Sequence, residues 1–161
     1  MSARRSTPDE NATHVVWRWT SCTPEGPARA RAALRCALDR LGYDGEVMSD
    51  AVLAVSELIA NATEHAVGPY EMRVRRTTGA VICEIEDHDP RIPTMPDFPA
   101  AAPFTPVEED RGGGLDALVA LLSERGRGFH IVHELSHGAW GFTRRSAATK
   151  FSWLALPLPV R

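Results

Sequence analysis

The feature that most constrains the fold is segment 46–66, where apolar residues recur at a strong helical period. They form one broad stripe: Val47, Met48, Ala51, Val52, Val55, Leu58, Ile59 and Ala62. A stripe of this width predicts a helix with one face in the core. The other elements must supply the surface that covers it.

The same segment carries a second, polar line of residues. Glu57, Asn61 and His65 are spaced at i, i+4 and i+8, so they stack along one side of the predicted helix. A solvated helix face is the ordinary explanation for this spacing. Asn61, however, is a poor helix former placed in mid-helix, with no cap or turn to explain it. This favours a site in which a carboxylate, a carboxamide and an imidazole are directed at one region.

Composition sets broad limits on the function. A chain of 161 residues with 43% hydrophobic and 24% charged residues is typical of one globular domain with a real core. A formal net charge of -3 predicts no extended basic surface for nucleic acid. No apolar run follows Arg4 and Arg5, and no stretch of about 18 apolar residues occurs, so we expect neither export nor a membrane span. The expected location is the cytoplasm.

The three cysteines favour the same compartment. Cys22, Cys36 and Cys83 are widely spaced and form no CxxC pair. They predict free thiols rather than a disulfide framework or a cysteine zinc site.

Before the central helix, the sequence predicts an arm, a strand and a helix. Residues 1–13 are polar and expected to be disordered, and alternation in 14–20 places Val15, Trp17 and Trp19 on one strand face. Thr23, followed by proline, is the expected N-cap of a helix that ends at Gly42. Asp44 is a plausible cap for the central helix.

After the central helix, the pattern changes to a hairpin of strands 70–75 and 80–86 around a turn at 77–79. On the second strand, period two makes Asp87 the next residue in the apolar row of Val81, Cys83 and Ile85. An acid would then extend a buried face, which is costly unless it is satisfied. Alternatively, the strand ends earlier and Asp87 opens a turn.

The remaining chain predicts a long loop, a helix and a hairpin. Segment 90–106 holds six of the 12 prolines without periodicity, and 115–122 could form a short helix. A helix is expected from Gly128, and strands at 139–145 and 149–156 complete the chain. Residues 14–161 therefore predict a single α+β domain, a two-layer sandwich with a mostly antiparallel sheet covered on one face by helices.

Three segments resemble the motifs of the GHKL ATPase superfamily, in the form used by actinobacterial anti-sigma-factor serine kinases and related histidine-kinase-like ATPases. Segment 54–66 resembles the N box, 84–93 a degenerate G1 box and 124–132 the G2 box. The resemblance implies the Bergerat ATP-binding fold, with ATP and Mg²⁺ as ligands. The chain has no P-loop motif, so ATP binding would not be of that kind.

The resemblance also implies roles for individual residues. Glu57 would be the general base, Asn61 the magnesium ligand and Asp87 the acceptor for the exocyclic amine of adenine. Loop 90–123 would be a mobile lid. The phosphates would be gathered by Gly126, Arg127 and Gly128, and Thr149 would lie near adenine. Glycines before a helix suit this role because they allow close approach to an anion; segment 112–114 is a competing glycine-rich candidate.

One position departs from the superfamily pattern. Asp89 stands two residues after Asp87, where the wider superfamily has glycine. This substitution bears on the affinity for nucleotide more than on the location of the site.

The activity implied by the resemblance is a serine/threonine protein kinase. It would bind a sigma factor and transfer the γ-phosphate of ATP to a hydroxyl of an anti-sigma-factor antagonist protein; a homodimer is left open. The alternative is a nucleotide-dependent protein-binding module without phosphate transfer.

A rival motif is the HExxH sequence formed by His133, Glu134 and His137. On a helix its two imidazoles could hold zinc, with Glu134 as the base of a peptidase. A catalytic zinc needs a third protein ligand, and residues 138–161 contain no His, Asp, Glu or Cys. An upstream ligand such as His130 keeps this zinc site as a third hypothesis.

Overall fold

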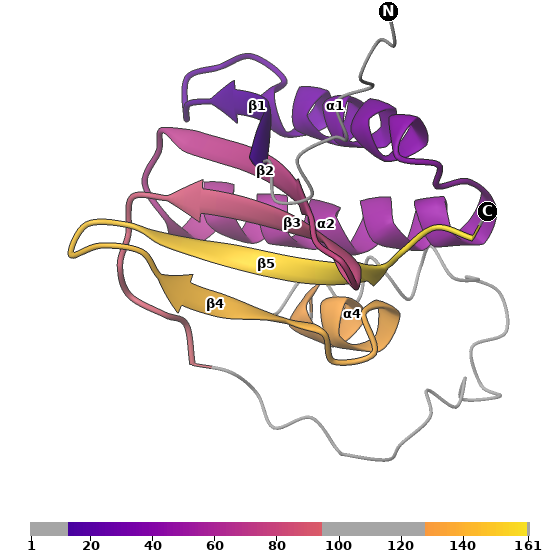
Figure 1. The fold of residues 1–161 in the computed structure, drawn as a ribbon. Helices are drawn as coiled ribbons and strands as arrows, with labels where there is room; N and C mark the ends of the chain where they lie inside the picture. The colour runs from indigo at the N-terminus through magenta and orange to yellow at the C-terminus, as the bar shows by residue number, and fades with distance from the viewer. Residues whose placement is uncertain (1–12, 95–127, 161) are drawn as a thin grey trace, which may run out of the picture.

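The computed structural model describes residues 13–94 and 128–160. Its elements follow the order strand, helix, helix, hairpin, helix, hairpin (Figure 1). They are β1 (Thr13–Trp19), α1 (Gly26–Arg40), α2 (Gly45–His65), β2 (Tyr70–Arg76), β3 (Ala80–Asp87), α4 (Gly128–Leu135), β4 (Trp140–Arg144) and β5 (Lys150–Pro157). The predicted helix at 115–122 lies outside the described residues, as does the part of the predicted lid that follows residue 94.

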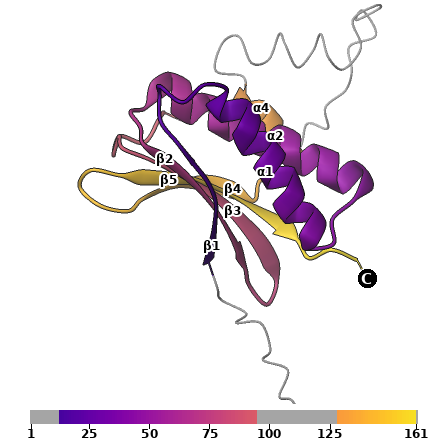
Figure 2. The same ribbon diagram turned by 90° about the horizontal axis from the view of Figure 1, so that it is seen from above.

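The strands form a five-stranded sheet in the order β1-β2-β3-β5-β4, with every neighbouring pair antiparallel. The helices lie on one face of this sheet (Figures 1 and 2). The predicted α+β two-layer sandwich is therefore confirmed. Within 13–94 and 128–160, none of the helices combines the length and apolar character needed to cross a bilayer.

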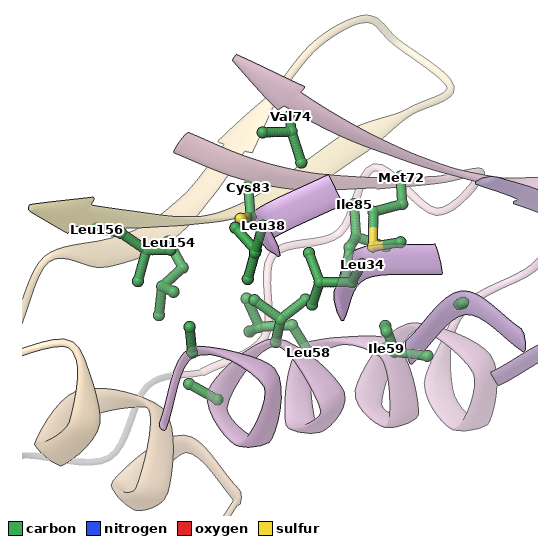
Figure 3. Close-up of a cluster of buried hydrophobic side chains, with 14 of the residues drawn as sticks. Leu34, Leu38, Leu58, Ile59, Met72, Val74, Cys83, Ile85, Leu154 and Leu156 are labelled. Carbon is green, nitrogen blue, oxygen red and sulfur yellow. The ribbon is translucent and has the colours of Figure 1, made fainter. Parts of the chain in front are cut away.

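The core lies between α2, α1 and the covered face of the sheet (Figure 3). Leu58 and Ile59 of α2 are fully buried, as are Leu34 and Leu38 of α1. The apolar stripe predicted from the sequence forms most of the buried face of α2, except that Val47 is 50% exposed. Val47 lies in the first turn of α2, at the edge of the packed layer.

Strand β1 corrects the predicted alternation at its start. The register shifts between Val15 and Trp17, which is a β-bulge. Val16 and Trp17 both pack against the core, whereas Val15 is 43% exposed. The prediction that Val15 shares a face with Trp17 and Trp19 was wrong, because one extra residue at the bulge reverses the alternation.

Helix α1 begins later than the capping pattern predicted. It starts at Gly26, and the hydroxyl of Thr23 accepts a hydrogen bond from the backbone N–H of Thr20 instead of capping the helix (2.9 Å). Asp44 occupies the N-cap position of α2, as predicted, although its side chain makes no capping hydrogen bond. The hydroxyl that was predicted to cap α1 is thus used in a local hydrogen bond of the preceding turn.

The face of the sheet away from the helices carries a network of charges. Arg73 of β2, only 5% exposed, contacts Glu71, Glu84 and Glu86 at 3.0–3.5 Å. The β2–β3 register places Arg73 opposite Glu84. Cross-strand pairs of opposite charge support this register.

We expect Leu58→Ala to destabilise the fold by about 2–5 kcal/mol, because it removes a buried side chain and leaves a cavity that the surrounding residues fill only partly. Urea unfolding followed by circular dichroism measures this. Val47→Ala on the same helix is the matched control, and its effect should stay within about 0.5 kcal/mol because Val47 is exposed. Equal effects of the two changes would contradict the assignment of the core face.

Candidate functional site

The polar line predicted on α2 opens onto a pocket where α2 meets the start of α4. The pocket is lined by Glu57, Ala60, Asn61, Glu64, His65, Gly128 and Phe129. Glu57 and Asn61 are partly buried, whereas His65 is exposed near the helix end. The structure therefore brings together Glu57, Asn61 and Gly128, which the sequence proposed as parts of one site.

Gly128 lies very close to the side chain of Glu57. A Cβ atom built on Gly128 would lie 2.6 Å from Oε2 of Glu57, well inside van der Waals contact. The carboxylate therefore lies directly against the backbone at the start of α4. A larger residue at position 128 would require this carboxylate to move.

The environment of Glu57 changes its acidity. Burial raises the pKa of Glu57 above its ordinary value, and the nearby Glu64 carboxylate raises it further. A carboxylate with a raised pKa is a better proton acceptor near neutral pH.

Asp87 is the last residue of β3, so the predicted continuation of the buried row is confirmed. Its side chain is 3% exposed, and Oδ1 accepts hydrogen bonds from Nζ of Lys150 (3.0 Å) and from the backbone N–H of Asp89 (2.9 Å). Burial raises the pKa of Asp87, although Lys150 and the Asp89 N–H act in the opposite direction. The acid is buried, and one of its two oxygens is paired with two donors.

Hydrogen bonds connect the end of β3 to the loop that follows α2. The backbone N–H of His88 donates to the carbonyl of Val67 (2.8 Å), and Nδ1 of His88 lies 2.8 Å from the carbonyl of Pro69. Asn61 lies four residues before the end of α2 at His65, or about 6 Å along the helix axis. Asp87 and Asn61 thus belong to segments that meet at the same end of α2.

The aspartate that replaces the superfamily glycine is accommodated without strain. Among described non-glycine residues, only Glu25 and His137 have positive φ, so Asp89 does not adopt a glycine conformation. Its carboxylate accepts hydrogen bonds from the guanidinium of Arg91 at 2.8 and 3.0 Å. These bonds hold the pKa of Asp89 well below its usual range. The Asp89 side chain is therefore turned to Arg91.

Three further predicted site residues are Thr149, Gly126 and Arg127. Thr149 lies in the β4–β5 turn, where its hydroxyl pairs with that of Ser146 (3.0 Å), and its contact with a base stays a prediction. Gly126 and Arg127 lie outside the described residues.

The HExxH sequence does not form the helical pair that zinc binding needs. Helix α4 ends at Leu135, and His137 has a φ of 52° beyond it, so His133 and His137 do not share a helix face. Nδ1 of His133 accepts a hydrogen bond from the indole of Trp140 (3.1 Å). Within the described residues, no group of three or more His, Cys, Asp or Glu side chains could hold a metal. The geometry therefore gives no support to the zinc peptidase hypothesis.

Sequence reasoning missed Lys150. It is the only lysine in a chain with 18 basic residues. In β5 it occupies the buried row that continues through Ser152, Leu154 and Leu156. The sequence pattern that could have indicated Lys150 is its position in the alternating row that includes Leu154 and Leu156.

Comparison with known protein families also identifies a domain that includes these residues. The family model described as "Histidine kinase-like ATPase domain" matches residues 20–147, which is most of the chain. This span contains Glu57, Asn61, Asp87 and Gly128, and ends before Lys150. A search among curated proteins found no match.

We expect Gly128→Ala to destabilise the protein only while Glu57 is present. The new methyl group would force the Glu57 carboxylate to move to another side-chain conformation, so the free energy of unfolding should fall by about 0.5–1.5 kcal/mol. In a Glu57→Ala background the same change should be neutral or stabilising, because alanine favours a helix. Urea unfolding of the four variants gives the coupling free energy, and additive effects would contradict the close approach.

Proposed function

The chain belongs to the histidine kinase-like ATPase family, whose domain binds ATP, and we propose that it is an ATP-dependent serine/threonine protein kinase of the anti-sigma-factor type. The observation that carries this proposal is the pairing of Glu57 and Asn61, one helical turn apart, in a pocket bounded by Gly128. This arrangement supports transfer of phosphate to a hydroxyl that enters beside Glu57.

The oxygen atoms of the pocket suit a magnesium–nucleotide complex. Mg²⁺ prefers oxygen ligands and commonly keeps waters while binding one or two protein groups together with phosphates. The amide oxygen of Asn61 would supply such a ligand, and Gly126, Arg127 and Gly128 would receive the phosphates. When bound, Mg²⁺ would neutralise charge on the phosphates.

Glu57 would act as the general base. It would take the proton from a serine or threonine hydroxyl of the partner as the hydroxyl oxygen attacks the γ-phosphorus. The bond from that phosphorus to the β,γ-bridging oxygen then breaks, which releases ADP and leaves the phosphate on the partner. The raised pKa of Glu57 suits this proton transfer.

Asp87 would bind the base of the nucleotide. A buried carboxylate that ends β3 offers an acceptor for the exocyclic amine of adenine. The hydrogen bond from His88 to Val67 supports this role, because it connects the segment after Asp87 to the loop that follows the helix carrying Asn61. Thr149, in the turn before β5, would be near adenine.

The proposed partners follow the same family type. The substrate would be an anti-sigma-factor antagonist protein with a reactive hydroxyl, the second partner a sigma factor, and the expected compartment the cytoplasm. A nucleotide-dependent binding module shares the same ATP site but transfers no phosphate to any partner. Phosphate transfer by the unchanged protein separates these two functions.

We expect Glu57→Gln to slow phosphate transfer by about 100- to 10,000-fold while ATP binding is retained, because only the proton acceptor is lost. Transfer of labelled γ-phosphate and calorimetric titration with MgATP measure the two effects. Asn61→Ala and Asp87→Asn should instead weaken ATP binding. Absence of transfer by the unchanged protein with every sigma-factor antagonist tested would favour the binding module.

The rate of transfer should also depend on the ionisation of Glu57. The base acts only when deprotonated, so the rate should fall as the pH drops through a pKa that lies above the ordinary glutamate value. A pH profile of the single-turnover rate tests this. A profile whose acid limb lies at the ordinary glutamate pKa would contradict the effect of burial.

A further inference from the structure

The buried pair of Asp87 and Lys150 is the feature of the site that the proposed catalytic roles leave unexplained. The two side chains are 3% and 4% exposed, and their charged atoms lie 3.0 Å apart. Removing two charges from water is costly, so a buried ion pair is weak evidence of a gain in stability. The pair contains the only lysine of the chain.

The hydrogen bonds to Asp87 are unevenly divided between its two oxygens. Both donors, Nζ of Lys150 and the backbone N–H of Asp89, bond to Oδ1. Within the described part of the chain, Oδ2 has no hydrogen-bond partner. Nζ of Lys150 also donates to the backbone carbonyl of Asp89 (2.7 Å), which fixes the turn after β3. The carboxylate thus presents one occupied oxygen and one available oxygen.

We propose that Lys150 is a positioning residue of the base site, which holds Oδ1 of Asp87 so that Oδ2 remains the acceptor for the exocyclic amine of a purine. This inference rests on the proposed function, because it assumes that Asp87 receives the base. Lys150 acts through Asp87 and fixes the orientation of the carboxylate.

The pair also determines which purine is accepted. An ionised carboxylate only accepts hydrogen bonds, so it suits the 6-amino group of adenine and rejects the 6-oxo group of hypoxanthine. A protonated carboxyl has an O–H that could donate to a 6-oxo group. Burial raises the pKa of Asp87, and the hydrogen bond from Lys150 acts against this effect and favours the ionised carboxylate. Without Lys150, discrimination between the two bases should weaken as the pH falls.

Other charged and titratable groups lie on the elements around Asp87. Asp89 and Arg91 follow β3 and are paired with each other. Arg144 of β4 is opposite Lys150 in register and exposed. The last turn of α2 carries Glu64 and His65, both more than two-thirds exposed. His88, the next residue after Asp87, is hydrogen bonded to Pro69.

The test is the ratio of the dissociation constants for MgITP and MgATP, measured by calorimetry between about pH 6 and pH 8. The unchanged protein should prefer ATP by a nearly constant ratio. In Lys150→Met the affinity for ATP should fall roughly tenfold or more, because the Asp87 carboxylate loses the charged hydrogen bond that holds its orientation. The preference for ATP should decrease further toward the acid end.

Two matched variants separate positioning from a general loss of charge. Arg144→Met removes the neighbouring cation that does not bond Asp87, and should leave the ratio and its pH dependence unchanged. Asp87→Asn should weaken the preference at every pH equally, because an amide does not titrate. If Arg144→Met reproduces the effect of Lys150→Met, the positioning role is wrong.

A second measurement keeps the inference testable if Lys150→Met fails to fold. Nitrogen-15 lysine labelling of the unchanged protein gives a single side-chain amine signal, since the chain has one lysine. Saturation with MgATP should shift this signal more than MgITP does. An unmoved signal overturns the inference while the proposed function stands; if neither calorimetry nor NMR detects ATP binding, both fail.

Discussion

The packing of α2 on the sheet is the interaction on which the rest of the structure depends. One side of this helix buries Leu58 and Ile59 against the core, and an adjacent line exposes Glu57 and Asn61 to a pocket. Because both lines belong to one rigid helix, the core packing also fixes the direction of the site residues. Stability and the geometry of the site therefore have the same origin.

Much of this arrangement could be predicted because it is local in sequence. Helical periodicity gave α2, alternation gave the β2–β3 hairpin, and period two placed Asp87 in a buried row, which the structure confirms. The two-layer architecture followed from the order of the elements. Glu57 and Asn61 were found because a spacing of four residues places side chains on one helix face.

What the sequence could not give depends on contacts between distant segments. The bulge in β1 is defined only by its partner strand, so the face of Val15 was predicted wrongly. The hydroxyl of Thr23 was taken by a turn rather than by α1. Lys150 lies 63 residues from Asp87, and nothing local to either residue indicates the pair. Its discovery needed the register of β3 against β5.

The hydrogen bond between His88 and Val67 has a consequence for the energetics of recognition. It anchors the segment that ends at Asp87 to the loop that leaves α2, within the folded chain itself. The separation between the Asp87 carboxylate and the Asn61 amide is then established when the protein folds. A ligand that fits this spacing binds with little free-energy cost for ordering the protein. A ligand of a different length is not accommodated by a change in this spacing.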